Sequence, residues 1–227
     1  MDRKSYEKQL VGERAADYIR DGMIVGLGTG STIAFTIKKL GERLKRETLN
    51  ITCVSTSNQT SELAKSLGIP MKELNEVSHI DLTIDGVDEF DPQLNGIKGG
   101  GGALLFEKIV AKASKSNIWV ADGSKEVDIL GAFPLPVEVL PFGSQHTARA
   151  IREKGLDPKL RMDGENPYRT DSRNFILDCH IGKITEPERL SQWLNALPGV
   201  IENGLFINIV GKVLIPEGDN DVKVIGK

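Results

Sequence analysis

The chain has 227 residues, enough for one large α/β domain or for a main domain with a smaller companion. Its net charge of -3 argues against a nucleic-acid-binding surface, and 39% hydrophobic with 27% charged residues is ordinary for a globular protein. No apolar run approaches the roughly 20 residues of a membrane helix, and the first ten residues lack a signal-peptide core. The two cysteines form no CxxC pair and the three histidines are scattered, so we expect a cytoplasmic protein with reduced thiols and no zinc site.

Helices and short buried strands alternate over the first half of the chain. Apolar residues at helical spacing predict the helices, and short apolar runs bounded by turns predict the strands. This alternation indicates a Rossmann-like α/β fold with a doubly wound, mainly parallel sheet. The predicted helices cover residues 4–19, 33–46 and 58–67, and the predicted strands cover 23–27, 51–54, 70–74, 80–84 and 117–121.

A glycine-rich turn, Gly28 to Thr32, joins the first strand to the next helix. Its glycines let the backbone approach an anion, and its hydroxyl groups add hydrogen-bond donors. Ser31 replaces the third glycine of a dinucleotide-binding fingerprint, and the turn lacks the lysine of a P-loop. We therefore expect the turn to bind a small phosphate group; the alternative is a tight turn that caps a helix at Ser31 or Thr32.

The stretch from His79 to Lys112 carries the densest set of candidate catalytic groups. Its order is a strand, an acidic loop over 85–91, a lysine, four glycines and an apolar helix. Bare glycine amides before a helix suit an oxyanion, and carboxylates beside a lysine can transfer protons. The alternative is a solvated loop with a glycine linker, and the spacing does not fit a calcium-binding EF-hand. The candidates are Asp85, Asp88, Lys98 and Glu107.

Four of the predicted strands end in polar or glycine-rich segments. In a parallel sheet the carboxyl ends of the strands meet at one edge, where ligands bind in open α/β folds. We therefore expect one shared site at that edge. The segments are 28–32, 55–58, 85–91 and 122–125.

After Gly131 the pattern changes to a proline-rich extended segment, followed by strands and helices in the order β-α-β-β-α. This order is typical of a small α+β domain of the ferredoxin-like kind. Apolar runs at 204–209 and 212–215 are predicted to return the chain to the first sheet. The predicted domains are a main catalytic domain over 1–131 plus 205–227 and a smaller α+β domain over 132–204.

An ordered set of motifs runs along nearly the whole chain. The motifs are VGLGTGST at 25–32, TSNQT at 56–60, DGVDEFD at 85–91, IKGGGGALLFEKIVA at 97–111, VADGSK at 120–125, LPVEVLPF at 135–142 and NFILD at 174–178. A single glycine motif would be weak evidence, but the whole set in this order is highly specific, and it resembles the ribose-5-phosphate isomerases of the A type. One departure is Phe106, where the family commonly has arginine.

The resemblance implies an aldose–ketose isomerase that interconverts D-ribose 5-phosphate and D-ribulose 5-phosphate through an enediolate. Such an enzyme acts in the non-oxidative branch of the pentose phosphate pathway, without a metal or another cofactor. The resemblance makes Glu107 the catalytic base and Lys98 a group that stabilises the enediolate, while Asp85 assists ring opening and proton transfer. Lys8 is a further candidate for binding the phosphate. The implied substrate-binding residues are Thr29, Gly30, Ser31, Thr32, Asp85, Gly86, Val87, Asp88, Lys98, Gly99, Gly100, Gly101 and Lys125.

The resemblance also implies a homodimer, or a dimer of dimers, that binds a sugar phosphate but neither nucleic acid nor a membrane. Two other functions stay open at this point. An amino-sugar phosphate isomerase/deaminase uses a similar glycine–threonine–glycine–serine turn. A sugar-phosphate-sensing domain would bind without turnover, but such a domain usually needs an output module, and the sequence has no helix-turn-helix or basic segment.

Overall fold

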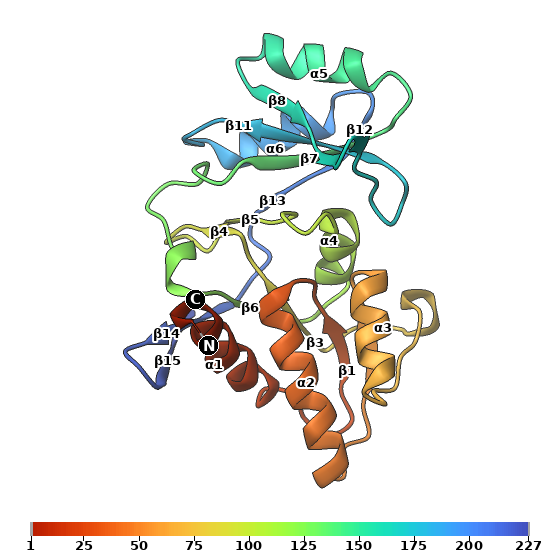
Figure 1. Ribbon diagram of the computed structural model, residues 1–227, viewed down its shortest axis with the longest axis vertical. Helices are drawn as coiled ribbons and strands as arrows, with labels where there is room; N and C mark the ends of the chain where they lie inside the picture. The colour runs from red at the N-terminus through yellow and green to blue at the C-terminus, as the bar shows by residue number, and fades with distance from the viewer. Residues whose placement is uncertain (1, 227) are drawn as a thin grey trace. The chain divides into compact units, whose positions relative to one another are not determined.

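The computed structural model describes residues 2–226, which divide into two compact units (Figure 1). The large unit comprises residues 2–87, 106–125 and 209–226. The small unit comprises residues 88–105 and 126–208. Among the described residues, no helix is long and apolar enough to cross a membrane. The domain boundaries predicted from the sequence stay a prediction.

The large unit is built on a six-stranded sheet in the order β15-β14-β6-β3-β1-β2. Neighbouring strands are parallel except β14 and β15, which form an antiparallel hairpin at one edge. The central strands are buried on both faces, which explains why their sequences are continuously apolar rather than alternating. The predicted Rossmann-like, mainly parallel sheet is therefore confirmed. The strands are β1 (Ile24–Leu27), β2 (Thr52–Ser55), β3 (Leu82–Gly86), β6 (Asn117–Val120), β14 (Lys212–Glu217) and β15 (Asp221–Gly226).

The helices of the large unit pack their apolar faces on this sheet. Val11 of the first helix and Ile37 of the second lie in one buried cluster with Ile84 of β3. This cluster is the main core of the unit and fixes the strand ends that carry the predicted site. The helices are α1 (Arg3–Ala16), α2 (Ser31–Arg46), α3 (Asn58–Ser66) and α4 (Leu104–Lys112), whose first two residues belong to the small unit, with short 3-10 helices η1 (Leu74–Glu76) and η2 (Gly123–Lys125).

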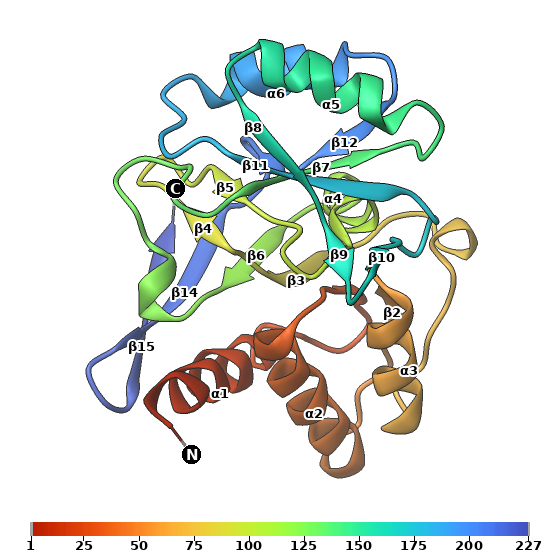
Figure 2. The same cartoon turned by 45° about the horizontal axis from the view of Figure 1, so that its top comes forward.

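The small unit contains a four-stranded antiparallel sheet in the order β12-β7-β11-β8 (Figure 2). Its elements follow the order β-α-β-β-α-β, which with this strand order is the ferredoxin-like arrangement. Ile151 and Leu194, one from each helix, share a buried cluster with Val137 and Leu177 of the sheet. The predicted α+β fold is confirmed. The elements are β7 (Leu135–Val139), α5 (Ser144–Glu153), β8 (Asp157–Leu160), β11 (Phe175–His180), α6 (Pro187–Asn195) and β12 (Val200–Asn203), with a short ribbon of β9 (Met162–Asp163) and β10 (Asn166–Pro167).

A second, three-stranded sheet in the small unit corrects two predictions. Residues 204–209 do not return to the first sheet, because β13 (Leu205–Phe206) pairs with β5 (Gly96–Ile97) instead. The acidic stretch 85–91 is not one loop, because β4 (Glu89–Phe90) pairs antiparallel with β5. The buried Glu89 carboxylate accepts hydrogen bonds from the backbone N–H groups of residues 131 and 133, at 2.6 and 3.1 Å, so it has a structural role.

The strand predicted over 70–74 is also wrong. Only Met71 forms an isolated bridge, to Cys53 of β2, and the segment then continues into η1. The bridge consists of two hydrogen bonds, from the Cys53 N–H to the Pro70 carbonyl and from the Lys72 N–H to the Cys53 carbonyl. Pairing stops there because the chain turns into η1, where the Glu73 N–H donates to the Glu76 carboxylate.

A buried carboxyl group in the small unit has a pKa that burial raises above its usual range. Glu138 of β7 is 1% exposed, and its Oε1 atom accepts hydrogen bonds from Thr170 and Asn174, both at 2.9 Å. These bonds oppose the effect of burial, whereas the nearby charges of Glu202 and Asp171 add to it. The Oε2 atom has no hydrogen-bond partner within residues 2–226.

We expect Glu138→Gln to stabilise the protein at pH 8. A raised pKa in the folded state means that ionisation favours unfolding, so this carboxyl group lowers the free energy of unfolding as pH rises above its ordinary value of about 4.3. Glutamine keeps an acceptor oxygen for Thr170 and Asn174 and carries no charge. Chemical denaturation at pH 5 and pH 8, with exposed Glu165→Gln as control, measures the effect. A loss of stability that is equal at both pH values would contradict this expectation.

Candidate active site

The predicted phosphate-binding turn lies where the winding of the large sheet reverses. After β1 the chain adds β2 on one side, and after β2 it crosses to add β3 on the other side of β1. The carboxyl ends of β1 and β3 therefore flank the switch point at which open α/β sheets bind ligands. Gly28–Thr32 follows β1 there, and Asp85 lies near the end of β3.

Gly28 and Asp85 are packed so closely that only glycine fits. A Cβ atom on Gly28 would lie 2.0 Å from Oδ1 of Asp85. The same Oδ1 atom accepts hydrogen bonds from the N–H groups of Thr29, at 3.0 Å, and Gly86, at 2.7 Å. The Asp85 carboxylate is 3% exposed, so the turn and the next strand jointly hold a buried carboxylate at the switch point.

A network of hydroxyl groups from the start of α3 and the residues before it holds the turn in place. Oγ1 of Thr29 lies 2.7 Å from Oγ1 of Thr56 and donates to Oγ of Ser57 at 2.8 Å. Ser57 caps α3 by accepting from the Thr60 N–H, and the Thr60 hydroxyl donates to the Gly28 carbonyl at 2.7 Å. The TSNQT motif thus supplies the support for the turn, a role that its sequence did not reveal.

The exposed end of the turn has the features of an anion site. Gly30 adopts φ 117°, a value that favours glycine, and precedes the 16-residue helix α2. The first N–H groups of this helix lack partners within the helix, and its dipole favours a negative charge there. Nζ of Lys8 donates to Oγ of Ser31 at 3.0 Å, which brings a positive charge to the same end.

Two further predicted residues of the large unit lie in helical segments, Glu107 in α4 and Lys125 in η2, which follows β6. Glu107 is in the first turn of α4 and is 3% exposed. Lys125 is in η2, and its N–H donates to the carbonyl of Asp122. Burial alone would raise the pKa of Asp122, but hydrogen bonds from Ser124 and the charges of Lys4 and Lys125 hold it below its usual range. Asp122 is therefore ionised at neutral pH.

The small unit carries the other predicted residues, Asp88, Lys98 and the glycine run. We call Gly99–Gly102 the glycine nest. Its Gly100 N–H donates to Oδ2 of Asp88 at 2.7 Å, and a Cβ on Gly100 would lie 2.6 Å from that carboxylate. The Lys98 side chain is 2% exposed, with Nζ 5.4 Å from the centre of the Phe206 ring. Asp88, the nest and a buried lysine are thus held within one compact unit.

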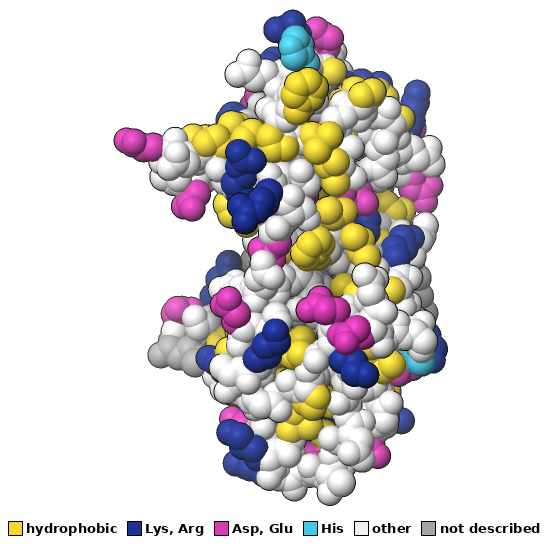
Figure 3. All heavy atoms as spheres, turned by 90° about the vertical axis from the view of Figure 1, so that its right-hand side faces the viewer, with side chains coloured by type: hydrophobic (Ala, Val, Ile, Leu, Met, Phe, Trp, Pro, Cys, Tyr) yellow, Lys and Arg dark blue, Asp and Glu magenta, His cyan; other side chains and the backbone are white. Residues whose placement is uncertain are grey.

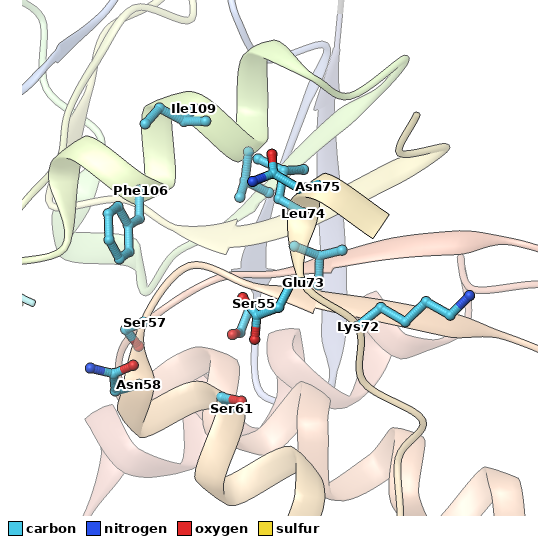
Figure 4. Close-up of a pocket in the computed structure, with 12 residues that line it drawn as sticks. Ser55, Ser57, Asn58, Ser61, Lys72, Glu73, Leu74, Asn75, Phe106 and Ile109 are labelled. Carbon is cyan, nitrogen blue, oxygen red and sulfur yellow. The ribbon is translucent and has the colours of Figure 1, made fainter. Parts of the chain in front are cut away.

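A separate cavity of about 310 Å³ lies in the large unit (Figure 4). Figure 4 shows Phe106 and Ile109 of α4 on one side and Ser57 and Asn58 at the start of α3 on the other. Ser55, Ser57 and Asn58 of the predicted segment 55–58 line this cavity, whereas none of the residues predicted to be catalytic or substrate-binding does.

Comparison with known proteins identifies the family. The model of the family "Ribose 5-phosphate isomerase A (phosphoriboisomerase A)" matches residues 52–220. The ribose-5-phosphate isomerase A proteins of Lactiplantibacillus plantarum and Enterococcus faecalis are each 54% identical to this chain, over 92% of both chains. A D-ribose-5-phosphate isomerase structure in complex with phospho-erythronic acid is 38% identical, with a TM-score of 0.95 over 100% of both chains. The Plasmodium falciparum ribose 5-phosphate isomerase is 35% identical, with a TM-score of 0.95 over 98% of this chain and 99% of that one.

Matches of this extent make the chain an isomerase of the α/β type. It belongs to the ribose 5-phosphate isomerase A family. The family and the enzyme class predicted from the sequence are confirmed, and the deaminase and sensor alternatives are not supported.

The structure brings some of the predicted site residues into contact and shows which groups hold them; their roles stay predictions. Within the large unit, Thr29, Asp85 and Gly86 are in direct contact. Within the small unit, Asp88 contacts Gly100. Sequence reasoning placed Thr56 and Ser57 at the shared site but gave them no role. It assigned no site role to Thr60 near the turn, or to Arg161, Tyr168 and Asp178 beside the glycine nest.

We expect Gly28→Ala to weaken binding of ribose 5-phosphate at least about tenfold, equivalent to about 1.4 kcal/mol. The added methyl group must displace the Asp85 carboxylate or the turn itself. Gly211→Ala is the control, because its Cβ would have no atom nearer than 4.0 Å. Calorimetric titration with thermal unfolding of both variants measures the effect, and wild-type affinity in Gly28→Ala would contradict it.

Proposed function

We propose that this chain interconverts D-ribose 5-phosphate and D-ribulose 5-phosphate through an enediolate, in the non-oxidative branch of the pentose phosphate pathway. The observation that carries the proposal is the buried Asp85 carboxylate held at the switch point by the turn that opens α2. A phosphate-binding helix end and a buried acid within one unit suit a small sugar phosphate that must exchange protons. The family matches support the same reaction.

The phosphate group is bound away from the reacting carbons. We assign it to the amides of Gly30, Ser31 and Thr32 and to the hydroxyls of Ser31 and Thr32, with Lys8 beside Ser31. Thr29, also predicted as a binder, orders this end of the turn, because its N–H and its hydroxyl already donate to Asp85 and Ser57. Lys125 is assigned as a further cation for the substrate. Binding energy from this remote group holds the open chain in position for the chemistry at carbons 1 and 2.

Proton transfer is assigned to carboxylates. Asp85 assists opening of the furanose ring and moves the proton between the two oxygens, and Asp88 holds a sugar hydroxyl. Glu107 takes the proton from carbon 2 of the aldose, which leaves the enediolate, and returns it to carbon 1 to give the ketose. No proton is gained or lost overall, so the isomerisation needs no redox partner.

The enediolate carries negative charge on oxygen while the proton is on Glu107. We assign its stabilisation to Lys98 and to the amides of Gly99, Gly100 and Gly101. Buried, fixed donors are more effective than water, because they need no reorganisation when the charge forms. The burial of Lys98 and the fixed geometry of the nest support this assignment.

We expect Glu107→Gln to keep ribose 5-phosphate binding but to lose turnover by at least about 100-fold, since glutamine cannot accept the proton. A chelator should leave wild-type turnover unchanged, because no step uses a metal. Exposed Glu42→Gln of α2 serves as control. Turnover is measured by ribulose 5-phosphate formation with and without chelator, and binding by calorimetry.

Near-native turnover in Glu107→Gln would refute the base assignment, and activity restored only by an added metal would refute the metal-free mechanism. Binding without turnover in the wild type would instead indicate a sugar-phosphate-binding domain. Release of ammonia from glucosamine 6-phosphate would indicate a deaminase.

We also propose a cytoplasmic homodimer, or a dimer of dimers, that binds neither nucleic acid nor a membrane. Hydrophobic side chains gather on one face of the small unit (Figure 3). Phe142 is 93% exposed, and Leu140 and Ile201 are also exposed, at 43% and 37%. Leu140 and Ile201 lie at the same end of β7 and β12, where the Leu140 N–H donates to the Gly199 carbonyl. Such a patch supports association.

The cysteines support the cytoplasmic assignment. Cys53 and Cys179 are both buried and unpaired. Burial raises the pKa of each thiol to about 12, so both remain protonated and unreactive at neutral pH. Neither thiol is suited to a disulfide of an exported protein.

We expect Phe142→Ser to shift the protein from dimer towards monomer, because serine removes the most exposed apolar side chain of the patch. Light scattering coupled to size-exclusion chromatography, over a range of protein concentrations, measures the change. Exposed Met162→Ser of the same unit is the control. An unchanged dimer in Phe142→Ser would place the interface elsewhere, and a monomeric wild type would refute the dimer.

A further inference from the structure

Arg161 of the small unit binds the glycine nest from its carbonyl side. Its Nη1 atom donates hydrogen bonds to the carbonyl oxygens of Gly99 and Gly100, at 3.0 and 3.1 Å. The hydroxyl of Tyr168 makes a longer contact, 3.4 Å, with the carbonyl of Gly101. Three successive carbonyl groups of the nest therefore have donors from a segment some 60 residues further along the chain.

Arg161 is itself held in one position. Its Nε and Nη2 atoms donate to the two carboxylate oxygens of Asp178, at 2.8 and 2.6 Å. Its backbone N–H donates to the carbonyl of Ile176, and its carbonyl accepts from the N–H of Tyr168. The side chains of Arg161 and Asp178 are only 15% and 21% exposed. A bidentate pair with this burial fixes the plane of the guanidinium group, which a lysine cannot do.

The carbonyl contacts determine where the nest amides point. In a trans peptide the N–H of one residue points away from the C=O of the residue before it. Because Arg161 holds the carbonyls of Gly99 and Gly100, the N–H groups of Gly100 and Gly101 point to the opposite side. The Gly100 N–H donates to Asp88 there. The Gly101 N–H has no acceptor among residues 2–226.

The residues of the nest are all glycine, and glycine has no side chain that could fix the conformation of the nest. Gly99 and Gly102 have φ values of 104° and 83°, which favour glycine. A Cβ on Gly102 would lie 2.2 Å from the hydroxyl oxygen of Tyr168. The nest has one hydrogen bond of its own, from the Gly102 N–H to the Gly99 carbonyl at 3.0 Å. A run of glycines has many accessible conformations, so the contacts of Arg161 and Tyr168 further restrict the peptide groups inside this turn.

We propose that Arg161, fixed by Asp178, is a positioning residue that aims the Gly101 amide at the oxyanion of the enediolate. This inference rests on the proposed function of the nest. Arg161 touches the carbonyls of the nest and acts through its backbone, so it is not itself a catalytic residue. Asp178 is also a positioning residue, because it fixes the guanidinium group of Arg161, which in turn holds the nest.

Two variants and one control test this role. Arg161→Lys keeps the positive charge but loses the planar guanidinium group. Asp178→Asn keeps Arg161 but removes the carboxylate charge that fixes it. Arg169→Met is the control, because Arg169 is an exposed arginine of the same unit that donates to the Arg173 carbonyl and stacks on Phe175. The measurements are kcat and KM for ribose 5-phosphate, thermal unfolding, and binding of two probes, inorganic phosphate and phospho-erythronic acid.

We expect kcat to fall about 100-fold in Arg161→Lys, the effect of losing one well-placed oxyanion donor. KM and the affinity for inorganic phosphate should stay near the wild-type values, since the proposed phosphate turn is in the other unit. Phospho-erythronic acid, which adds a carboxylate to the phosphate, should bind more weakly. Asp178→Asn should lower kcat and the affinity for phospho-erythronic acid in the same way but by smaller factors. Arg169→Met should match the wild type.

Two outcomes would overturn the inference. One is a wild-type kcat in both Arg161→Lys and Asp178→Asn. The other is a parallel loss of kcat and phosphate affinity with lower thermal stability, which indicates general structural damage. A wild type that does not isomerise ribose 5-phosphate would refute the proposed function instead. In that case the inference stands only if phospho-erythronic acid still binds the wild type more tightly than Arg161→Lys.

Discussion

The contact between Gly28 and Asp85 is the constraint on which the large unit's part of the site depends. Parallel pairing of β1 with β3 brings the two strand ends together, and the missing Cβ of Gly28 lets the carboxylate reach the turn. The Thr29 amide then binds the carboxylate, which orders the backbone that opens α2. One close approach thus determines both the position of an acid and the shape of an anion-binding turn.

Each unit uses the same physical solution for a glycine-rich segment. In the large unit the hydroxyls of Thr56, Ser57 and Thr60 hold the turn, and in the small unit Arg161 and Asp178 hold the nest. Glycine allows the backbone to approach a ligand, but it also leaves the segment with more conformations to lose. Buried donors and acceptors from elsewhere in the chain offset that entropy and select one arrangement of the amides.

The sequence predicted the sheet, the small α+β fold and the strand ends because these follow from local apolar patterns and from the winding rule for parallel sheets. It did not predict that Glu89 is structural, because the acid's partners are N–H groups some 40 residues away. The return of 204–209 to the first sheet was wrong for a related reason. Two adjacent apolar runs look alike, and only tertiary pairing separates β13 from β14.

The catalytic assignment of the sequence came from motif identity, whereas the support of the site could come only from structure. Arg161 follows an edge strand of the small sheet and lies outside the recognised sequence motifs, and its effect depends on a bidentate pair with Asp178.

The chain passes between the two units after residue 87 and again after residue 105. Asp85 and Asp88 flank the first passage, and Lys98 and Glu107 flank the second. Asp85 and Glu107, the residues assigned to proton transfer, therefore lie within two positions of these links. The groups that hold Asp85 and the nest are instead far apart along the chain: the Thr29 N–H binds Asp85, and Arg161 with Asp178 binds the nest.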